Sequence, residues 1–203
     1  MSGTDVPRGA ARREAILRAT LAMIGEHGAD AVTHRAVATA AGLPLSATTY
    51  WFSSRDELLE ESLRLAAREE VGRLERLVLD LAPRELSIGE WADAVAAELG
   101  GDLARDRSRH VALGELALEA GRRPELGEEV QRWHTAHLRL AELGLRAAGS
   151  DDPVADAPIV VAALVGFVMA QLSLPDAGFE REVLRPALER LFSRLVGEAV
   201  TAG

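Results

Sequence analysis

The chain has 203 residues, 48% of them hydrophobic, which is enough to build the core of one domain or of two small ones. The absence of cysteine excludes a disulfide framework, a thiolate metal site and a cysteine nucleophile. A formal net charge of −9 at pH 7 argues against non-specific coating of nucleic acid.

The charge is distributed unevenly along the chain. Residues 1–55 hold six Arg and four acidic residues, a net charge of +2, out of totals of 23 basic and 32 acidic residues. The remainder of the chain is therefore strongly acidic. Every basic residue is Arg, whose guanidinium makes bidentate contacts with phosphate and guanine that Lys cannot make. The amino-terminal quarter is the part suited to nucleic acid.

Neither a signal peptide nor a membrane span is expected. The first segment, MSGTDVPRGAARR, is polar and lacks the apolar stretch of a secretory signal. The most apolar stretch, residues 159–174, is short of the roughly 20 residues that a helix needs to cross a bilayer. We therefore expect a cytoplasmic protein.

Residues 1 to about 9 predict a disordered arm. A first helix should follow as far as Glu26, with Gly28 after its end and an apolar stripe that includes Leu17, Leu21 and Ile24. Three basic side chains in this region could reach a DNA backbone or simply remain solvated; they are Arg8, Arg12 and Arg13.

Residues 33–52 predict two short helices joined by a tight turn. Thr33 is placed as the N-cap of the first helix, between the apolar residues Val32 and Val37. Gly42 is a residue that can adopt a positive φ without steric cost. Helix, glycine turn and helix form the helix-turn-helix pattern, whose second helix enters the DNA major groove. The spacing by itself also fits an ordinary pair of packed helices.

This stretch resembles the DNA-binding domain of TetR-type transcriptional regulators. The matching positions are Arg12, Arg13, Thr33, Val37, Ala38, Ala41, Gly42, Tyr50, Phe52, Arg55 and residues 56–59. Two positions depart from the family pattern. Pro44 stands where a Ser often caps the recognition helix, and Thr49 stands where a Tyr usually contacts the DNA backbone. The docking mode should survive both changes, but base reading can differ.

The resemblance implies DNA contacts from both helices. Arg35 matches a position that reaches a base, and a bidentate contact to guanine suits its guanidinium. Ser46, Ala47 and Thr48 are expected to face the groove, with Ala47 or Thr48 meeting a thymine methyl group. The residues expected to bind phosphate or to position the recognition helix are Thr33, Thr49, Tyr50, Trp51 and Arg55. Arg12 and Leu45 complete the candidate set.

The rest of the chain predicts further helices. Capping boxes at Ser54–Glu57 and Ser87–Glu90 start a long helix over about 55–81 and a second helix that ends at Gly100-Gly101. Other helices are predicted at about 103–120, with a break at 106–108, and at 125–148, 159–174 and 180–199. We therefore expect an all-α fold, with a helix-turn-helix domain at 1–54 and a domain for ligand binding and dimerisation at 55–203.

The last two predicted helices suggest an interface between two copies of the chain. Residues 159–174 are apolar nearly all round and predict a buried helix. The small residues on one of its faces are Ala162, Gly166 and Ala170. The last helix has a heptad-like series, namely Leu184, Leu188, Leu191 and Leu195. The resemblance implies that both helices pair with their copies in a four-helix bundle, so a homodimer is expected.

No catalytic motif is found, so we expect neither an enzyme nor a cofactor. The chain lacks Gly-x-Ser-x-Gly, a P-loop and Gly-x-Gly-x-x-Gly. His134 and His137 could share a metal with Glu115 or Glu119, but no third ligand is close in sequence, which favours a structural role. Asp151-Asp152 fits a helix cap better than a cation site. No metal is expected.

The resemblance also implies a small-molecule effector bound among the later helices. The candidate lining residues, each of which could instead belong to the core, are Trp91, His110, Leu113, Trp133, His137, Phe167 and Gln171. The predicted function is a repressor of neighbouring genes that binds a near-palindromic operator and responds to a ligand that moves the long fourth helix. The alternatives are an activator, a regulator that answers to a protein partner, and a helical enzyme.

Overall fold

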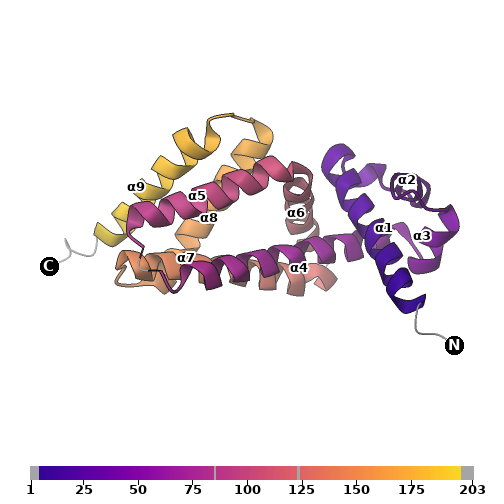
Figure 1. Ribbon diagram of the computed structural model, residues 1–203, viewed down its shortest axis with the longest axis horizontal. Helices are drawn as coiled ribbons and strands as arrows, with labels where there is room; N and C mark the ends of the chain where they lie inside the picture. Colours follow the sequence, from indigo (N-terminus) through magenta and orange to yellow (C-terminus); the bar gives the residue numbers. More distant parts are fainter. Residues whose placement is uncertain (1–4, 85, 123, 198–203) are drawn as a thin grey trace. The chain divides into compact units, whose positions relative to one another are not determined.

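The structure is a computed structural model that describes residues 5–84, 86–122 and 124–197. These residues form α-helices, short 3₁₀ segments and one π-helical segment, and no strand is found among them (Figure 1). The expected all-α fold is confirmed. The chain divides into two compact units. Unit 1 comprises Met1–Glu69 and Arg107–Val130, and unit 2 comprises Glu70–Asp106 and Gln131–Gly203.

Unit 1 is built around the amino-terminal helices. Its elements are α1 (Asp5–His27), η1 (Ala29–Ala31), α2 (His34–Ala40), α3 (Leu45–Trp51), the first part of α4 (Arg55–Leu81), α6 (Arg107–Ala120), η2 (Pro124–Leu126) and the start of α7 (Gly127–Ala148). Its buried apolar residues include Ile16, Leu17, Ile24, Val32, Val37, Phe52, Leu58 and Leu63. The predicted boundary between a DNA-binding domain and a ligand-binding domain, at residue 54, stays a prediction. It differs from the boundary of this compact unit, which also contains the start of α4 and all of α6.

Helix α1 begins earlier than expected. Its first residue is Asp5, so the prediction of a disordered arm is wrong for residues 5–9, and residues 1–4 lie outside the described residues. Pro7 is compatible with this start, because amides of the first helical turn have no partner within the helix. Near its other end α1 crosses α6 closely. A Cβ atom added at Gly25 would lie 2.4 Å from the Ser108 backbone, so only glycine fits there.

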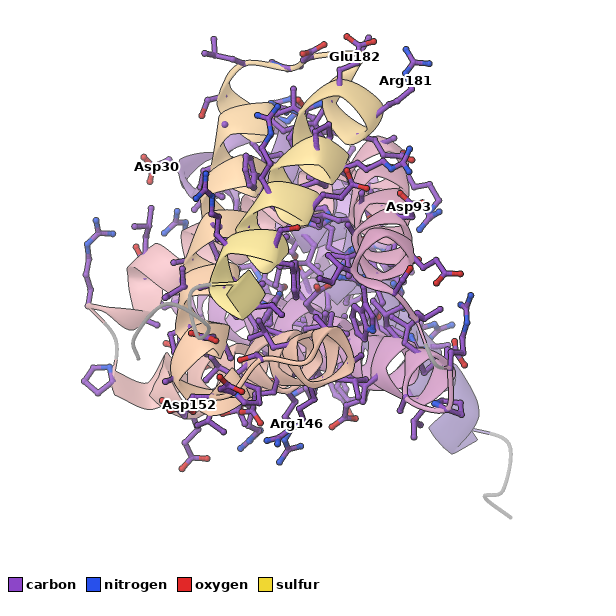
Figure 2. All side chains as sticks on the ribbon, turned by 90° about the vertical axis from the view of Figure 1, so that its left-hand side faces the viewer. Asp30, Asp93, Arg146, Asp152, Arg181 and Glu182 are labelled. Atoms are coloured by element: carbon purple, nitrogen blue, oxygen red, sulfur yellow. The ribbon has the colours of Figure 1, made fainter. Side chains whose placement is uncertain are left out.

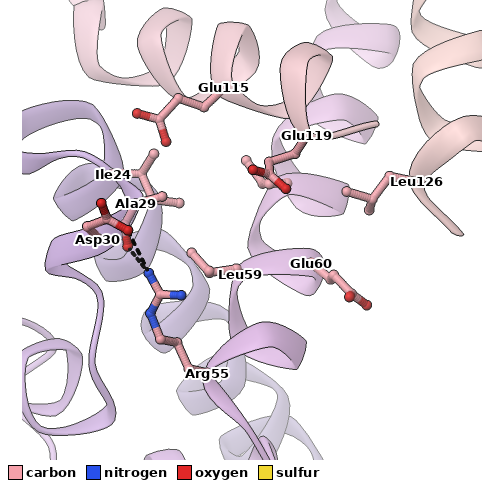
Figure 3. Close-up of a pocket in the computed structure, with 10 residues that line it drawn as sticks. Ile24, Ala29, Asp30, Arg55, Leu59, Glu60, Glu115, Glu119 and Leu126 are labelled. Carbon is pink, nitrogen blue, oxygen red and sulfur yellow. Dashed lines mark hydrogen bonds and ion pairs between the residues drawn. The ribbon is translucent and has the colours of Figure 1, made fainter. Parts of the chain in front are cut away.

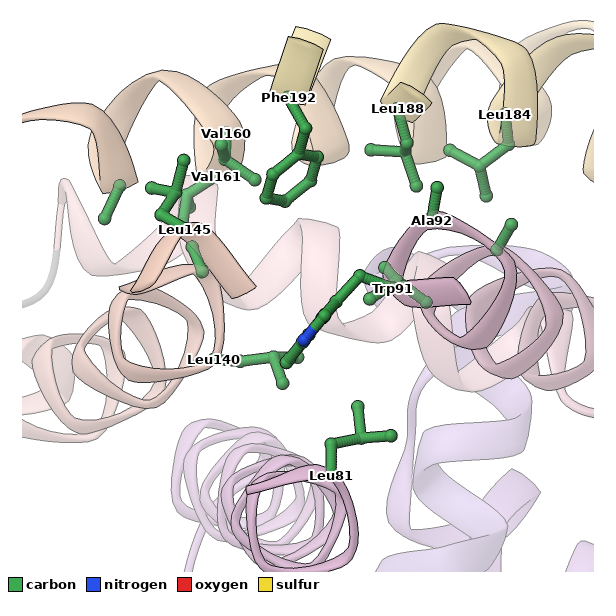
Figure 4. Packing of buried hydrophobic residues seen from close by; sticks show 14 of the residues in the cluster. Leu81, Trp91, Ala92, Leu140, Leu145, Val160, Val161, Leu184, Leu188 and Phe192 are labelled. Atoms are coloured by element: carbon green, nitrogen blue, oxygen red, sulfur yellow. The ribbon is translucent and has the colours of Figure 1, made fainter. Parts of the chain in front are cut away.

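Unit 2 holds the larger apolar core (Figure 4). Its elements are the remainder of α4 and α7, α5 (Ile88–Arg105), α8 (Pro153–Ser173), the π-helical segment η3 (Phe179–Leu184) and α9 (Arg185–Gly197). Trp91 from α5 lies against Gly144 of α7, where an added Cβ would be 3.0 Å from the indole ring. Long helix α4 spans Arg55–Leu81, close to the predicted range, and it runs without interruption from unit 1 into unit 2.

Two predicted N-caps are confirmed in unit 2. Ser87 and Glu90 form a full capping box at the start of α5. Asp152 accepts a hydrogen bond from the Ala155 amide at 3.1 Å and caps α8, at the same end of unit 2 as Arg146 in the last turn of α7 (Figure 2). Both caps were predictable because an N-cap acts within one helical turn.

The predicted end of α5 is wrong. The helix continues through Gly100 and Gly101 to Arg105, and the chain breaks at Asp106 as the sequence predicted. Gly100 is explained by packing rather than by helix termination. A Cβ atom there would lie 2.8 Å from the Cβ of Glu180 in η3, so glycine allows a close approach between the two segments.

Two predictions about the carboxy-terminal helices are also corrected. Leu184 of η3 and Leu188 of α9 are fully buried in the core of unit 2, so they are not available to a second copy, while Leu191 and Leu195 are partly buried against that core. Helix α8 is not buried all round. It covers the core with Ala157, Val160 and Val161, and much of its other side is exposed.

Helix α8 is also longer than its apolar run suggested. By length and composition alone, α8 could cross a membrane. The prediction from the sequence did not indicate this, because it considered only the apolar residues 159–174. The core helix of a soluble protein passes the same test. Within the described residues, 17% of the most apolar window of α8 is buried.

Candidate nucleic-acid interface

The turn between α2 and α3 is built as the sequence predicts. Thr33 is the N-cap of α2, and its side chain accepts a hydrogen bond from the Ala36 amide at 3.1 Å. Gly42 has a φ of 64°, which only glycine adopts without strain. The Leu43 amide donates to the Ala38 carbonyl at 2.9 Å, and the Gly42 amide donates to the Thr39 carbonyl at 3.1 Å. This pair of bonds closes the end of α2 in a Schellman motif.

Thr48 joins the two helices of the motif and does not face outward. Its side chain is 0% exposed, and its hydroxyl lies 2.9 Å from the Leu45 carbonyl and 3.3 Å from the His34 carbonyl of α2. The prediction that Thr48 meets a thymine methyl is therefore wrong. A β-branched residue with one hydroxyl fits an interior contact between helices, and sequence alone did not distinguish that from a groove contact.

The other candidate residues form an exposed surface over α2 and α3. Those exposed to solvent are Thr33, Arg35, Leu45, Ser46, Thr49 and Tyr50, while Ala47 and Trp51 are half-buried. Arg12 of α1 is exposed as well. The Thr49 hydroxyl lies 3.3 Å from the Leu45 carbonyl and stays close to its own helix. The surface thus offers a guanidinium, hydroxyls and an aromatic ring to a partner.

The aromatic pair at the end of α3 has a fixed geometry. The rings of Tyr50 and Trp51 meet edge to face, with centroids 5.1 Å apart. The Trp51 ring lies against α1, because a Cβ atom added at Gly9 would be 3.4 Å from it. Tyr50 is 78% exposed. Trp51 therefore anchors the helix end, and Tyr50 projects its hydroxyl outward.

Two arginines expected to reach DNA are used inside unit 1. Arg55 donates from Nε to the Val32 carbonyl at 2.9 Å and from Nη2 to the Ala29 carbonyl at 2.6 Å. This fulfils the expected alternative of positioning the motif rather than binding phosphate. Arg13 pairs with Glu61 at 2.5 Å, and its guanidinium lies 5.3 Å from the centroid of the Phe52 ring. It is therefore a link between α1 and α4, contrary to expectation.

The start of α4 is stabilised by a variant of the predicted capping box. The Ser54 hydroxyl accepts from the Glu57 amide at 3.1 Å, but the Glu57 carboxylate accepts from the amide and hydroxyl of Ser53 instead of Ser54. These hydrogen bonds to Ser53 lower the pKa of Glu57. An ionised carboxylate at this helix start also interacts favourably with the helix dipole.

Unit 1 contains a pocket that sequence reasoning missed (Figure 3). It has about 480 Å³ of empty space, partly open to solvent, and it is lined by Ile24, Ala29, Asp30, Arg55, Leu59, Glu60, Leu63, Glu115, Glu119 and Leu126. Burial, with added repulsion from Asp30 and Glu119, raises the pKa of Glu115. The carboxylates of this pocket come from segments that are distant in the sequence, so no local sequence pattern predicts the pocket. Their charge disfavours phosphate, so this pocket is not part of the DNA surface.

The candidate effector residues are distributed over both units. His110 and Leu113 are buried in unit 1, whereas Trp91, Trp133, His137, Phe167 and Gln171 belong to unit 2. Both ends of the Gln171 amide are occupied: Nε2 donates to the Asp176 carbonyl and Oε1 accepts from the Asp176 amide, each at 3.0 Å. Gln171 therefore closes the turn after α8 and is not free to bind a ligand.

His137 has the features of a buried neutral imidazole. Its Nδ1 lies 3.0 Å from the Trp133 carbonyl, and the two rings meet edge to face with centroids 5.5 Å apart. Burial lowers the pKa of His137. Among the described residues no group of three or more His, Asp or Glu is placed to hold a metal ion.

Family comparisons match the chain in two parts. A model of bacterial regulatory proteins of the tetR family matches residues 16–62, and a tetracyclin-repressor-like C-terminal domain matches residues 86–194. The HTH-type transcriptional regulator PksA of Bacillus subtilis (strain 168) is 37% identical over 75 residues, which are 36% of this chain and 37% of that protein. The match therefore spans little more than a third of this relative.

Solved structures resemble nearly the whole chain. The multidrug binding protein EbrR, in complex with imidazole, is 32% identical, with 89% of this chain and 94% of that chain covered and a TM-score of 0.63. A TetR family member from Streptomyces coelicolor A3 is 32% identical, with coverages of 89% and 97% and a TM-score of 0.66. A transcriptional regulator from Rhodococcus sp. Rha1, 21% identical over 92% of this chain and 96% of that chain with a TM-score of 0.74, shows the fold alone.

The interior position of Thr48 can be tested against its exposed neighbour. Thr48→Val removes a buried hydroxyl that bonds a carbonyl, so it should lower the free energy of unfolding by about 1 kcal/mol. Thr49→Val makes the same chemical change at an exposed site and should stay within about 0.5 kcal/mol of wild type. Urea unfolding measures both. A Thr48→Val protein of unchanged stability but altered base preference would place Thr48 in the groove instead.

Proposed function

The chain belongs to the TetR family of bacterial regulatory proteins and is a DNA-binding transcriptional regulator, and we propose that it is a cytoplasmic homodimeric repressor released from a palindromic operator by a small molecule. The observation that carries this proposal is the exposed surface of α2 and α3. There Arg35 is free on a pair of helices that Thr48 joins into one body. A rigid helix pair with exposed donors is what base reading requires.

Some arginines of unit 1 bind groups of their own chain and others are exposed, and this difference supports a specific DNA contact. Arg13 and Arg55 satisfy groups inside unit 1, whereas Arg12 and Arg35 remain exposed. The proposal assigns Arg35 to a guanine edge and Arg12 to phosphate. Leu45, Ser46 and Ala47 would then face bases, while Thr33, Thr49 and Tyr50 would contact the backbone.

The exposed side of α8 supports dimerisation. Its large apolar residues there are Ile159 at 49% exposure, Val165 at 48% and Met169 at 41%, with Leu174 following the helix at 81%. The small residues Ala162, Gly166 and Ala170 are exposed between them. Soluble monomers rarely expose a contiguous apolar stripe of this kind. We assign it to a second copy of the chain, which would present two recognition helices to a palindromic operator.

The effector part of the proposal rests on unit 2 and on α4. EbrR, a structural relative, has been solved with ethidium and with proflavin. In this chain Trp91, Trp133 and His137 present polar atoms in the interior of unit 2. Because α4 continues unbroken from unit 2 into unit 1, a shift of its second half should change the position of α2 and α3. Gly72 does not interrupt it, since an added Cβ would make only an ordinary contact with Arg76 at 3.5 Å.

A footprint on the DNA that flanks the gene tests the proposal as a whole. A dimeric repressor should protect two half-sites related by two-fold symmetry, with centres separated by about one or two helical turns. Transcription from the protected promoter should fall when the protein is added. Protection of one asymmetric site, or a rise in transcription, would contradict the proposal.

The role of Arg35 can be separated from that of a phosphate contact. Arg35→Ala should cost about 1–3 kcal/mol of operator binding, concentrated at one base pair in each half-site. The control is Arg12→Ala, which should weaken binding to all sequences alike and reduce the salt slope by about 1. Binding to a panel of operators with single base changes measures this difference. An equal loss on every sequence for Arg35→Ala would make Arg35 a phosphate contact.

The dimer assignment can be tested at Gly166. No atom of its own chain lies within 4 Å of a Cβ added there, so Gly166→Leu should not disturb the single chain. Against a closely packed copy, the larger side chain should cost about 1–3 kcal/mol of dimer stability. Gly127→Leu is the control, because that helical glycine also has open space around it. Sedimentation velocity should show dissociation for Gly166→Leu only, and an unchanged mass would place the interface elsewhere.

A further inference from the structure

The interior of unit 2 contains two hydrogen-bond donors without acceptors in the described part of the chain. The indole N–H of Trp91 is buried and unpartnered, and this residue is 1% exposed. The indole N–H of Trp133 is buried and unpartnered as well. Natural proteins seldom keep such donors, because the lost hydrogen bonds to water are not replaced. Two of them in one core call for an acceptor that the described residues do not provide.

A third polar group lies beside them. Because the Nδ1 atom of His137 lies 3.0 Å from the Trp133 carbonyl oxygen, it carries the proton and donates. Nε2 then has a free lone pair, for which the structure gives no donor among the described residues. Burial keeps this imidazole neutral, as the lowered pKa indicates. The ring is therefore an acceptor and not a cation.

These groups share one side of α7. Trp133, His137, Leu140 and Gly144 follow one another at intervals of four, three and four residues, which places them on one helix face. Trp91 reaches this face from α5, with its ring against Gly144 and its nitrogen on the side of Leu140 (Figure 4). From Trp133 to Gly144 the helix rises about 16 Å.

The charges around this face disfavour an anion. Arg73 contacts Glu70 at 2.5 Å, Glu98 at 3.0 Å and Asp102 at 3.4 Å, so carboxylates surround its guanidinium. Glu70 and Arg73 both act on the pKa of His137, which places the network close to the imidazole. Arg105 also contacts Asp102, at 3.7 Å, and Arg73, which contacts three carboxylates, has little capacity left for a ligand carboxylate.

We propose that the effector is a neutral aromatic molecule carrying a carbonyl-type oxygen that accepts a hydrogen bond from the Trp91 indole N–H. An anion would meet the carboxylates around Arg73. A cation that has only donors would leave both indoles unpaired. A neutral ring system with an acceptor satisfies the Trp91 indole, packs against its ring and requires no counter-charge. The inference rests on the proposed function, because it takes unit 2 to be the effector site.

A matched set of fluorenes tests this assignment. Fluorene, 9-fluorenone, 9-(aminomethyl)fluorene and fluorene-9-carboxylate share one ring system and differ in acceptor and charge at pH 7. Isothermal titration without DNA should show 9-fluorenone binding about fivefold to tenfold more tightly than fluorene, the increment of one hydrogen bond. The ammonium and the carboxylate should both bind more weakly than 9-fluorenone. In Trp91→Phe the preference for 9-fluorenone over fluorene should vanish, whereas Trp51→Phe, in unit 1, should retain it.

A second measurement uses the wild-type protein, in case Trp91→Phe fails to fold. The chain has three Trp residues, so ¹⁵N labelling of the indoles gives three N–H signals. The signal of Trp91 should move downfield with 9-fluorenone and much less with fluorene. Equal affinities for these two probes and no selective shift would mean that water alone meets the donors. Tightest binding by the ammonium, or no binding by any probe, would also overturn the proposal.

Operator binding keeps this test separate from the proposed function. If 9-fluorenone binds through Trp91 and operator affinity does not change, the inference about the site stands and the proposal of effector-controlled repression fails. If another compound releases the operator while the fluorenes show no acceptor preference, repression by effector stands and the inference is overturned.

Discussion

The hydrogen bonds from Arg55 to the carbonyls of Ala29 and Val32 hold the DNA-binding unit together. The segment between α1 and α2 turns sharply, so its carbonyls cannot all be satisfied by helix ladders. A guanidinium at the first residue of α4 meets two of them at 2.6 and 2.9 Å. The start of α2 is thereby tied to the start of α4. Through the Thr48 hydroxyl near the His34 carbonyl, α3 is tied to α2 in turn.

This series of contacts decides which cations are available to DNA. A guanidinium that satisfies backbone carbonyls or a carboxylate cannot also contact a phosphate without breaking those bonds. Arg13 and Arg55 are committed in this way, and the ones left exposed near the motif include Arg12 and Arg35. The same contacts tie the start of α4 to α2 and α3. A displacement of α4 should therefore move α2 and α3 as one body, with little change inside the motif.

The parts of the fold that could be predicted are those set within one or two helical turns. Thr33, Gly42, Ser87 and Asp152 act on amides and carbonyls at most a few residues away, and each was found in its predicted role. Periodicity identified helix faces but not what covers them. The placement of Thr48 in the groove followed from the family resemblance, and in the structure Thr48 is buried against α2.

Partners distant in sequence were the other limit. The acceptors of Arg55 lie 23 and 26 residues away, and Glu61 lies 48 residues from Arg13. Leu184 and Leu188 have the spacing of an interface, but the core of unit 2 covers them. No local pattern distinguishes a leucine covered by its own chain from one covered by a copy.

Helix α8 shows why an error about the single chain can still be informative. Its sequence is apolar nearly all round and predicted burial, yet only one side is covered in the structure. Composition reflects the surroundings in which a helix functions, whereas a single chain shows only the contacts that the chain makes with itself. The difference between the two is the exposed stripe from Ile159 to Ala170. Because water contact with such a stripe is unfavourable by roughly 25 cal/mol per Å², its exposure is itself an argument for a second copy.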